Sequence, residues 1–125
     1  MTAMPARVLV VEDNPLIALD TQDHLQALGI SGVDVAASND EALALLAGGG
    51  HDFALLDYNL GSETSEPVAN ALERRGVPFA FATGYVEAEV TQRPYANKIA
   101  VLLKPYAKAE LTALMHRLVP RLSPL

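Results

Sequence analysis

Three carboxylates follow two short apolar runs of the sequence. Glu12 and Asp13 come directly after residues 8–11, and Asp57 comes directly after residues 53–56. The carboxyl ends of neighbouring strands in a doubly wound sheet meet at one crevice, so we expect these side chains to converge. Like charges converge at a high cost unless a hard divalent cation with its waters is held between them. The pattern therefore predicts a Mg²⁺ site.

The expected ligand set follows from the octahedral shell of Mg²⁺. Asp13 and Asp57 would each give one carboxylate oxygen, and Asn59 would give its backbone carbonyl. Waters would complete the shell, and Glu12 would bond to a water on the metal. The predicted metal-binding residues are thus Glu12, Asp13, Asp57 and Asn59.

Three further groups are predicted at the same edge. Thr83 and Gly84 follow the fourth apolar run, and Lys104 follows the fifth. A hydroxyl, a backbone N–H and an ammonium can stabilise the oxygens of a transferring phosphoryl group. We expect Asn59, Gly84 and Lys104 to contact the phosphate, so the set predicts phosphoryl transfer to a carboxylate.

The elements that must position these groups are visible as a repeated pattern. Five strand-like runs are predicted at residues 7–11, 33–36, 53–56, 79–82 and 99–103. A segment of helical character follows each run. Runs that are apolar at successive positions are typical of parallel strands covered on both faces. We therefore predict an α/β fold, a doubly wound five-stranded parallel sheet with five helices.

Local chemistry marks the helix starts and the helix faces. Asn14 can cap a helix that has Pro15 at its first position, and Ser38 and Glu41 have the spacing of a capping box. The predicted core stripes are Ile17, Thr21, Leu25 and Leu28 on the first helix, Ala42, Leu45 and Leu46 on the second, and Leu111, Leu114, Met115 and Leu118 on the last.

Composition excludes several classes of function. The length of 125 residues suits one domain, and the net charge of −6 argues against binding nucleic acid. No apolar run is long enough to cross a bilayer and no signal peptide is recognisable, so we expect a cytoplasmic protein. Without cysteine, any chemistry must use carboxylates, hydroxyls or lysine. His24, His51 and His116 are predicted to lie on the surface and to form no site.

Four motifs resemble the receiver domains of two-component response regulators, over essentially the whole chain. They are Val10-Val11-Glu12-Asp13, Leu55-Leu56-Asp57-Tyr58-Asn59-Leu60, Thr83-Gly84 and Leu103-Lys104-Pro105. The resemblance implies a flavodoxin-like receiver fold with strand order 2-1-3-4-5, and residues 1–125 would form one receiver domain with no output domain.

The same resemblance assigns roles. It implies that Asp57 is the phosphoacceptor, that Glu12 and Asp13 are the acidic metal-binding pair, and that Thr83 is the switch hydroxyl. Lys104 would pair with the phosphate, and the Lys104–Pro105 peptide would be cis. The phosphoryl donor would be a histidine kinase or a histidine phosphotransfer protein. We expect a monomeric signalling acceptor and not an enzyme.

Residues 78–85 resemble the signature of the FATGY subclass, single-domain receivers that work with stress-response histidine kinases. The chain departs from the general receiver pattern three residues before Lys104, where Val101 replaces an aromatic. Tyr85, two residues after Thr83, is the predicted substitute in the switch. Leu16 and Leu19 could form a docking surface for a kinase, although scattered exposed leucines are common.

Other functions remain open or are disfavoured by particular residues. A receiver-like module that binds proteins without phosphorylation would have the same motifs. A metal-dependent phosphatase normally has a second aspartate two residues after its nucleophile, where this chain has Asn59. A flavodoxin needs a phosphate-cradling loop where this chain has the acidic Glu12-Asp13-Asn14-Pro15, which would repel a flavin phosphate.

Overall fold

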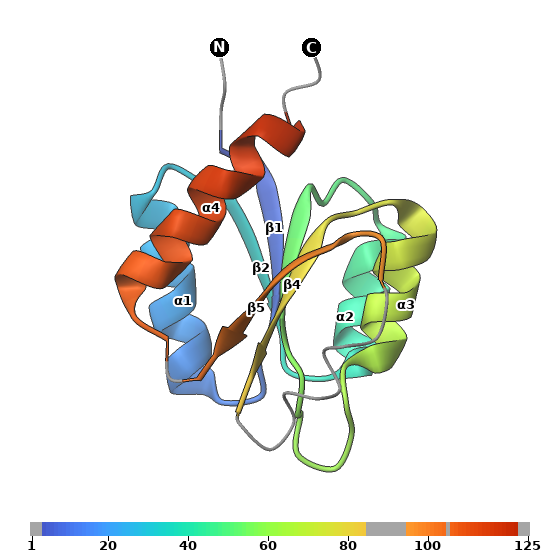
Figure 1. The fold of residues 1–125 in the computed structure, drawn as a ribbon. Coiled ribbons are helices and arrows are strands. Elements are labelled where there is room, and N and C mark those ends of the chain that lie inside the picture. The colour runs from blue at the N-terminus through green and yellow to red at the C-terminus, as the bar shows by residue number, and fades with distance from the viewer. Residues whose placement is uncertain (1–3, 85–94, 105, 123–125) are drawn as a thin grey trace.

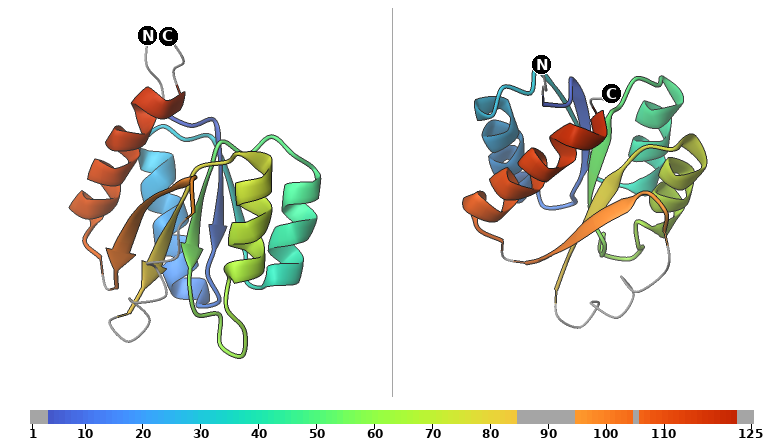
Figure 2. Two further views of the ribbon diagram at one scale, coloured as in Figure 1. Left: turned by 45° about the vertical axis from the view of Figure 1, so that its right-hand side comes forward. Right: turned by 45° about the horizontal axis from the view of Figure 1, so that its top comes forward.

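A five-stranded parallel sheet lies between two layers of helices (Figure 1 and Figure 2). The computed structural model describes residues 4–84, 95–104 and 106–122, with side chains up to residue 118. In chain order the elements are β1 (Arg7–Val11), α1 (Pro15–Ala27), β2 (Gly32–Ala36), α2 (Asn39–Ala47), β3 (Phe53–Asp57), α3 (Glu66–Arg75), β4 (Phe79–Thr83), β5 (Lys98–Leu103) and α4 (Lys108–Leu122).

The sheet has the order β2-β1-β3-β4-β5 with every neighbouring pair parallel, which confirms the predicted doubly wound topology. Four of the five expected helices are present in the described residues. The helix expected between β4 and β5 falls on residues 85–94, outside the described part of the chain. Among the residues described, no helix is both long enough and apolar enough to cross a membrane.

Each face of the sheet carries its own hydrophobic core. Leu9 and Val11 of β1 pack in the cluster under α2 and α3, whereas Val8 and Val10 pack in the cluster under α1 and α4. Successive residues of a strand point to opposite faces, so a strand covered on both sides has to be apolar throughout. This is why the central runs of the sequence contain no polar alternation.

The predicted helix starts are present. The side chain of Asn14 accepts hydrogen bonds from the N–H groups of Leu16 and Ile17 at 3.0 and 3.3 Å. The hydroxyl of Ser38 accepts from the Glu41 N–H at 3.2 Å. The Glu41 carboxylate completes the cap one residue earlier than a strict capping box, because it accepts from the N–H of residue 37 at 2.8 Å.

The core stripes of α2 and α4 are confirmed, and that of α1 is wrong at one position. Ile17 is 36% exposed, and the neighbouring Ala18 is buried instead. The face of α1 that packs on the sheet is centred on Ala18, Thr21 and Leu25, and one residue along a helix turns the side chain by about 100°. The side chain of Ile17 therefore lies outside the hydrophobic core between α1 and the sheet.

His51 contradicts the prediction that all three histidines lie on the surface. Its side chain is 1% exposed, and its Nε2 lies 2.8 Å from Asp34 Oδ2 on β2. Arg7 of β1 contacts the same carboxylate oxygen through Nη2 at 2.9 Å and donates from Nη1 to the carbonyl of Gly49 at 3.0 Å. Gly49 and Gly50 have φ angles of +75° and +89°, which residues with a side chain rarely adopt, so the glycine run allows the turn that brings His51 to Asp34.

The other two histidines differ from each other. His24 is half-buried, and its Nε2 lies 2.9 Å from the hydroxyl of Thr112 on α4. His116 is exposed, as predicted. Burial alone would raise the pKa of Asp34, but the hydrogen bonds and charges of His51 and Arg7 hold that pKa below its ordinary value.

Replacing His51 by alanine is expected to lower the free energy of unfolding by about 2 kcal/mol, because it removes a buried hydrogen bond to Asp34 and leaves a cavity. His116→Ala, on the exposed face of α4, is the matched control and should change it by less than about 0.5 kcal/mol. Urea unfolding followed by circular dichroism measures both. Equal stabilities of the two variants would contradict a structural role for the His51 pair.

Candidate functional site

The three predicted carboxylates converge at the carboxyl edge of the sheet. Glu12 and Asp13 follow β1, Asp57 ends β3, and one carboxylate oxygen from each lies within 4.8 Å of the others. Glu12 and Asp57 are buried, whereas Asp13 is exposed to solvent. The strand register places β1 and β3 side by side, and this brings residues far apart in the chain together.

Lys104 lies between the two buried carboxylates. Its Nζ is 3.2 Å from Glu12 Oε1 and 3.2 Å from Asp57 Oδ2. Its backbone N–H donates to the Thr83 carbonyl at 2.8 Å, which keeps the end of β5 beside the end of β4. The structure thus brings together four predicted site residues, and one ammonium faces two buried carboxylates.

Thr83 and Gly84 lie at the neighbouring strand end. Thr83 is buried, and its hydroxyl contacts the carbonyl of the half-buried Gly84 at 3.4 Å, a long hydrogen bond. Tyr85, the predicted substitute in the switch, lies outside the described residues, and so does Pro105 with its predicted cis peptide.

The loop after β3 folds back on itself beside the carboxylates. Asn59 forms an isolated antiparallel bridge with Thr64, and its side chain accepts from the Gly61 N–H at 3.2 Å. Gly61 has a φ of +83°, a conformation that side chains rarely adopt, and a Cβ added there would lie 3.7 Å from Asp13 Oδ2. The loop therefore lies against Asp13. Asn59, two positions after Asp57 in the sequence, belongs to this loop.

Electrostatics at the site are governed by crowding of negative charge. Burial, followed by the charge of Glu12 and a hydrogen bond with it, raises the pKa of Asp57 to about 7, although Lys104 opposes the shift. Burial alone would lower the pKa of Lys104, but Asp57 and Glu12 raise it above its ordinary value. One lysine does not balance three carboxylates, and a donor set made only of oxygens fits a hard divalent cation such as Mg²⁺.

The raised pKa of Asp57 has a measurable consequence for the metal-free protein. The folded state retains a proton that the unfolded state has lost between the ordinary pKa of 3.8 and about 7. The stabilisation from this proton is therefore present at low pH and is lost as the pH rises through about 7. Asp57→Asn should be more stable than the wild type at pH 8, by a few kcal/mol at most, and the difference should shrink toward pH 4.

Urea unfolding of both proteins in the presence of a metal chelator measures this difference. Asp23→Asn, on the exposed surface of α1, is the matched control and should follow the wild type. A stability gap between Asp57→Asn and the wild type that stays constant from pH 5 to pH 8 would contradict the raised pKa.

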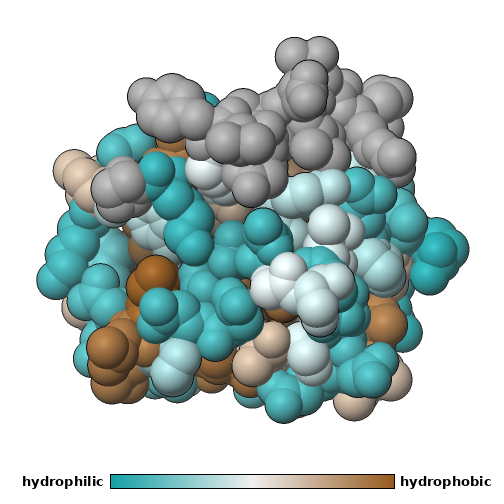
Figure 3. All heavy atoms as spheres, turned by 90° about the horizontal axis from the view of Figure 1, so that it is seen from below, coloured by the Kyte–Doolittle hydropathy of each residue, from teal (hydrophilic) through white to brown (hydrophobic). Residues whose placement is uncertain are grey.

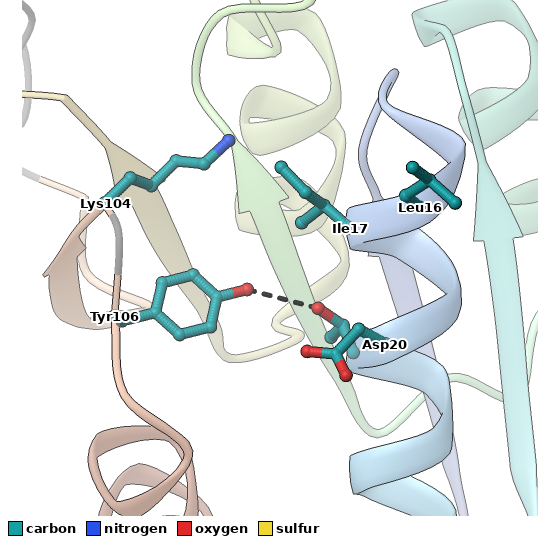
Figure 4. A pocket seen from close by; sticks show the side chains of 6 residues that line it. Leu16, Ile17, Asp20, Lys104 and Tyr106 are labelled. Atoms are coloured by element: carbon teal, nitrogen blue, oxygen red, sulfur yellow. Dashed lines mark hydrogen bonds between the residues drawn. The ribbon is translucent and has the colours of Figure 1, made fainter.

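A pocket beside Lys104 was not predicted. Leu16, Ile17, Asp20 and Thr21 of α1 line it opposite Lys104 and Tyr106, around a volume of about 470 Å³. Figure 4 shows Tyr106 reaching toward α1, where its hydroxyl lies 3.3 Å from that of Thr21. The feature of the sequence that could have predicted this pocket was an aromatic residue, Tyr106, two positions after Lys104.

Exposed apolar side chains lie on α1, next to the acidic edge. Leu16 is 78% exposed and Leu19 is 54% exposed. Figure 3 looks onto the carboxyl edge of the sheet and shows hydrophobic groups beside a hydrophilic centre. A second hollow, of about 550 Å³, runs from Glu12 and Asp13 past Leu19 to Val35. The predicted exposure of the two leucines is confirmed, and their role in docking stays a prediction.

Comparison with known proteins places this geometry in a family context. A family model described as the response regulator receiver domain matches residues 8–116. The chain is 39% identical to SdrG from Sphingomonas melonis Fr1, whose solution structure superposes with a TM-score of 0.76 over 92% of this chain and 96% of that one.

Two longer regulators are also similar. The phyllosphere-induced regulator PhyR of Methylorubrum extorquens is 30% identical over 91% of this chain, and the transcriptional regulatory protein PdtaR of Mycobacterium tuberculosis is 26% identical over 95%. The chain spans 43% of the length of PhyR and 59% of the length of PdtaR.

Proposed function

Because the chain belongs to the family of response regulator receiver domains, we propose that it accepts a phosphoryl group from a histidine kinase on Asp57 in a Mg²⁺-dependent reaction. The observation that carries the proposal is the convergence of Glu12, Asp13 and Lys104 on Asp57. Among the described residues, no carboxylate outside this cluster has both acidic neighbours and a lysine beside it, and within the cluster the resemblance to receiver domains gives the acceptor role to Asp57.

The chemistry is a transfer between two nucleophiles. A carboxylate oxygen of Asp57 attacks the phosphorus of a phosphohistidine, the P–O bond forms, and the P–N bond breaks. Lys104 and the hydroxyl of Thr83 stabilise the phosphoryl oxygens, and the N–H of Gly84 adds a further donor. Asp13, Asp57 and the Asn59 carbonyl would hold Mg²⁺, with Glu12 nearby. The bound ion would supply positive charge against the phosphoryl oxygens.

We place the signal in the change of charge at Asp57. Phosphorylation converts the Asp57 carboxylate, which Lys104 contacts, into an acyl phosphate that offers new acceptors to Thr83. The outcome is a shift between two conformations, or onward transfer to a histidine phosphotransfer protein. We propose a cytoplasmic protein of the FATGY subclass acting in stress signalling, and the likeness to a solved structure of the PhyR stress response regulator, at 29% identity over 95% of this chain, supports the role in stress signalling.

The docking surface for the kinase is proposed on α1. Leu16 and Leu19 expose apolar side chains within reach of the acidic edge, and a partner helix could bury them while presenting its phosphohistidine. Leu19→Glu should slow transfer from a cognate kinase and leave labelling by a small phosphodonor unchanged. Similar losses with both donors would place the effect at the site and not at docking.

The test of the function is phosphotransfer profiling. Candidate histidine kinases are phosphorylated, mixed with the protein and Mg²⁺, and the protein is followed by intact mass for the addition of one phosphoryl group. A small phosphodonor with Mg²⁺ should give the same product without a kinase. A chain that stays unlabelled with every donor, yet binds a partner, would support the phosphorylation-independent binding module instead.

A further inference from the structure

Four aromatic rings form a continuous row on one face of the sheet. Tyr58 contacts Phe81 with ring centroids 5.7 Å apart, and Phe81 contacts Phe79 at 5.5 Å. Tyr95 contacts Phe79 at 5.4 Å and Phe81 at 5.9 Å. Their planes cross at 61° to 84°, the edge-to-face arrangement that aromatic pairs prefer.

One end of the row lies at the candidate phosphoacceptor. Tyr58 follows Asp57 directly, and its N–H donates to the carbonyl of Ala82 at 2.9 Å. Side chains two residues apart on a strand share a face, so Thr83 is the next side chain after Phe81 on this face of β4. A change in the position of Thr83 therefore changes the packing beside Phe81.

The other end of the row is fastened to α3. Tyr95 is followed by Ala96 and Asn97, whose N–H groups donate to the Glu73 carboxylate at 2.7 and 2.9 Å. The carbonyl of Asn97 accepts from the N–H of Phe79 at 3.0 Å. These bonds tie the start of β5 to the last turn of α3, which lies on the same side of the sheet (Figure 1). A displacement of the Tyr95 ring would therefore disturb the hydrogen bonds from residues 96 and 97 to Glu73.

The strand that carries the aromatic switch in the general receiver pattern has no aromatic residue here. Val101 of β5 is in register with Phe81 and packs against the same cluster, but it is too short to cover the phenylalanine ring. Tyr95 covers it instead, from outside the strand. Resting on the function proposed above, we propose that Tyr95, through Phe81, is the aromatic that reports phosphorylation of Asp57.

The direction of the coupling follows from hydrogen-bond strength. Among the described residues, the Thr83 hydroxyl bonds only to the Gly84 carbonyl, at the long distance of 3.4 Å. Phosphoryl oxygens are charged acceptors and bind a hydroxyl more strongly than a neutral carbonyl does. Thr83 moves toward them, Phe81 repacks into the space beside it, and the Tyr95 ring follows. The bonds from residues 96 and 97 to Glu73 carry the change to α3.

The experiment observes the Tyr95 ring directly in the otherwise unaltered chain. The protein is labelled with 3-fluorotyrosine, and its four fluorine signals are assigned with single Tyr→Phe variants. Fluorine NMR spectra are recorded with Mg²⁺ before and after addition of a small phosphodonor, and intact mass gives the extent of phosphorylation. The Tyr95 fluorine signal should shift as the phosphorylated fraction of the protein rises.

Variants separate the ring from its hydroxyl. Tyr95→Leu removes the ring and should retain labelling of Asp57, but the amide signals of Ala96 and Asn97 should no longer shift on phosphorylation. Tyr95→Phe keeps the ring contacts and should retain those shifts. Tyr85→Leu tests the alternative reporter, and under the proposal it also retains the shifts at residues 96 and 97.

Each outcome decides between the proposals. If the protein is phosphorylated and the Tyr95 fluorine signal does not shift, the Tyr95 inference is overturned and the function of Asp57 stands. Loss of the remote shifts in Tyr85→Leu but not in Tyr95→Leu assigns the role to Tyr85. Absence of labelling in the wild type overturns the proposed function and this inference with it. The fluorine measurement needs no destabilising variant, so it remains decisive even if Tyr95→Leu does not fold.

Discussion

Asp57→Asn is expected to abolish addition of a phosphoryl group, both from a small phosphodonor and from a histidine kinase. An amide is a much weaker nucleophile than a carboxylate, so the acyl phosphate cannot form. The other groups of the site should stay in place, because asparagine has the same shape and can still accept a hydrogen bond from Lys104. The loss should therefore be specific to the chemistry.

Intact mass after incubation with donor and Mg²⁺ measures the effect. The wild type should gain one phosphoryl group, Asp57→Asn should gain none, and Asp23→Asn on the exposed surface of α1 should match the wild type. The fold of Asp57→Asn is checked by its urea unfolding, which should show undiminished stability. Equal labelling of wild type and Asp57→Asn would move the phosphoacceptor to another residue.

The sheet and the acidic edge could be predicted because their signals are local. The central strands are apolar at every position, and the carboxylates follow the strand ends directly, so the parallel topology alone brings Asp57 beside Glu12. Lys104 was predictable for the same reason, since it follows β5. The roles of these residues rest on chemistry and stay predictions.

Contacts that depend on long-range packing could not be predicted. His51 follows three glycines, a pattern typical of an exposed loop, and only the folded chain shows it against Asp34 and Arg7. The contact between the rings of Tyr95 and Phe81 was not predicted, because no spacing or motif in the sequence links these two residues. Ile17 was misplaced because two neighbouring helix positions fit the same apolar spacing.

The second large effect concerns the metal. Asp13→Ala is expected to abolish measurable Mg²⁺ binding, because Mg²⁺ has few protein ligands and this change removes an anionic one. Asp13 is exposed, whereas both carboxylate oxygens of Glu12 already accept hydrogen bonds. They contact the Asn14 N–H at 3.1 Å and Lys104 Nζ at 3.2 Å. Asp13 therefore needs to give up fewer partners to bind the ion.

Glu12→Ala should weaken Mg²⁺ binding less, because Glu12 is expected to act through a water and its loss also frees Lys104 to pair with Asp57 alone. Isothermal titration with MgCl₂ measures both variants, and Asp20→Ala, an exposed α1 carboxylate, serves as the control for net charge. Binding should strengthen as the pH rises through about 7, because the ion competes with the proton that burial and Glu12 retain on Asp57. A larger loss in Glu12→Ala than in Asp13→Ala would reverse the two roles and make the buried glutamate the direct ligand.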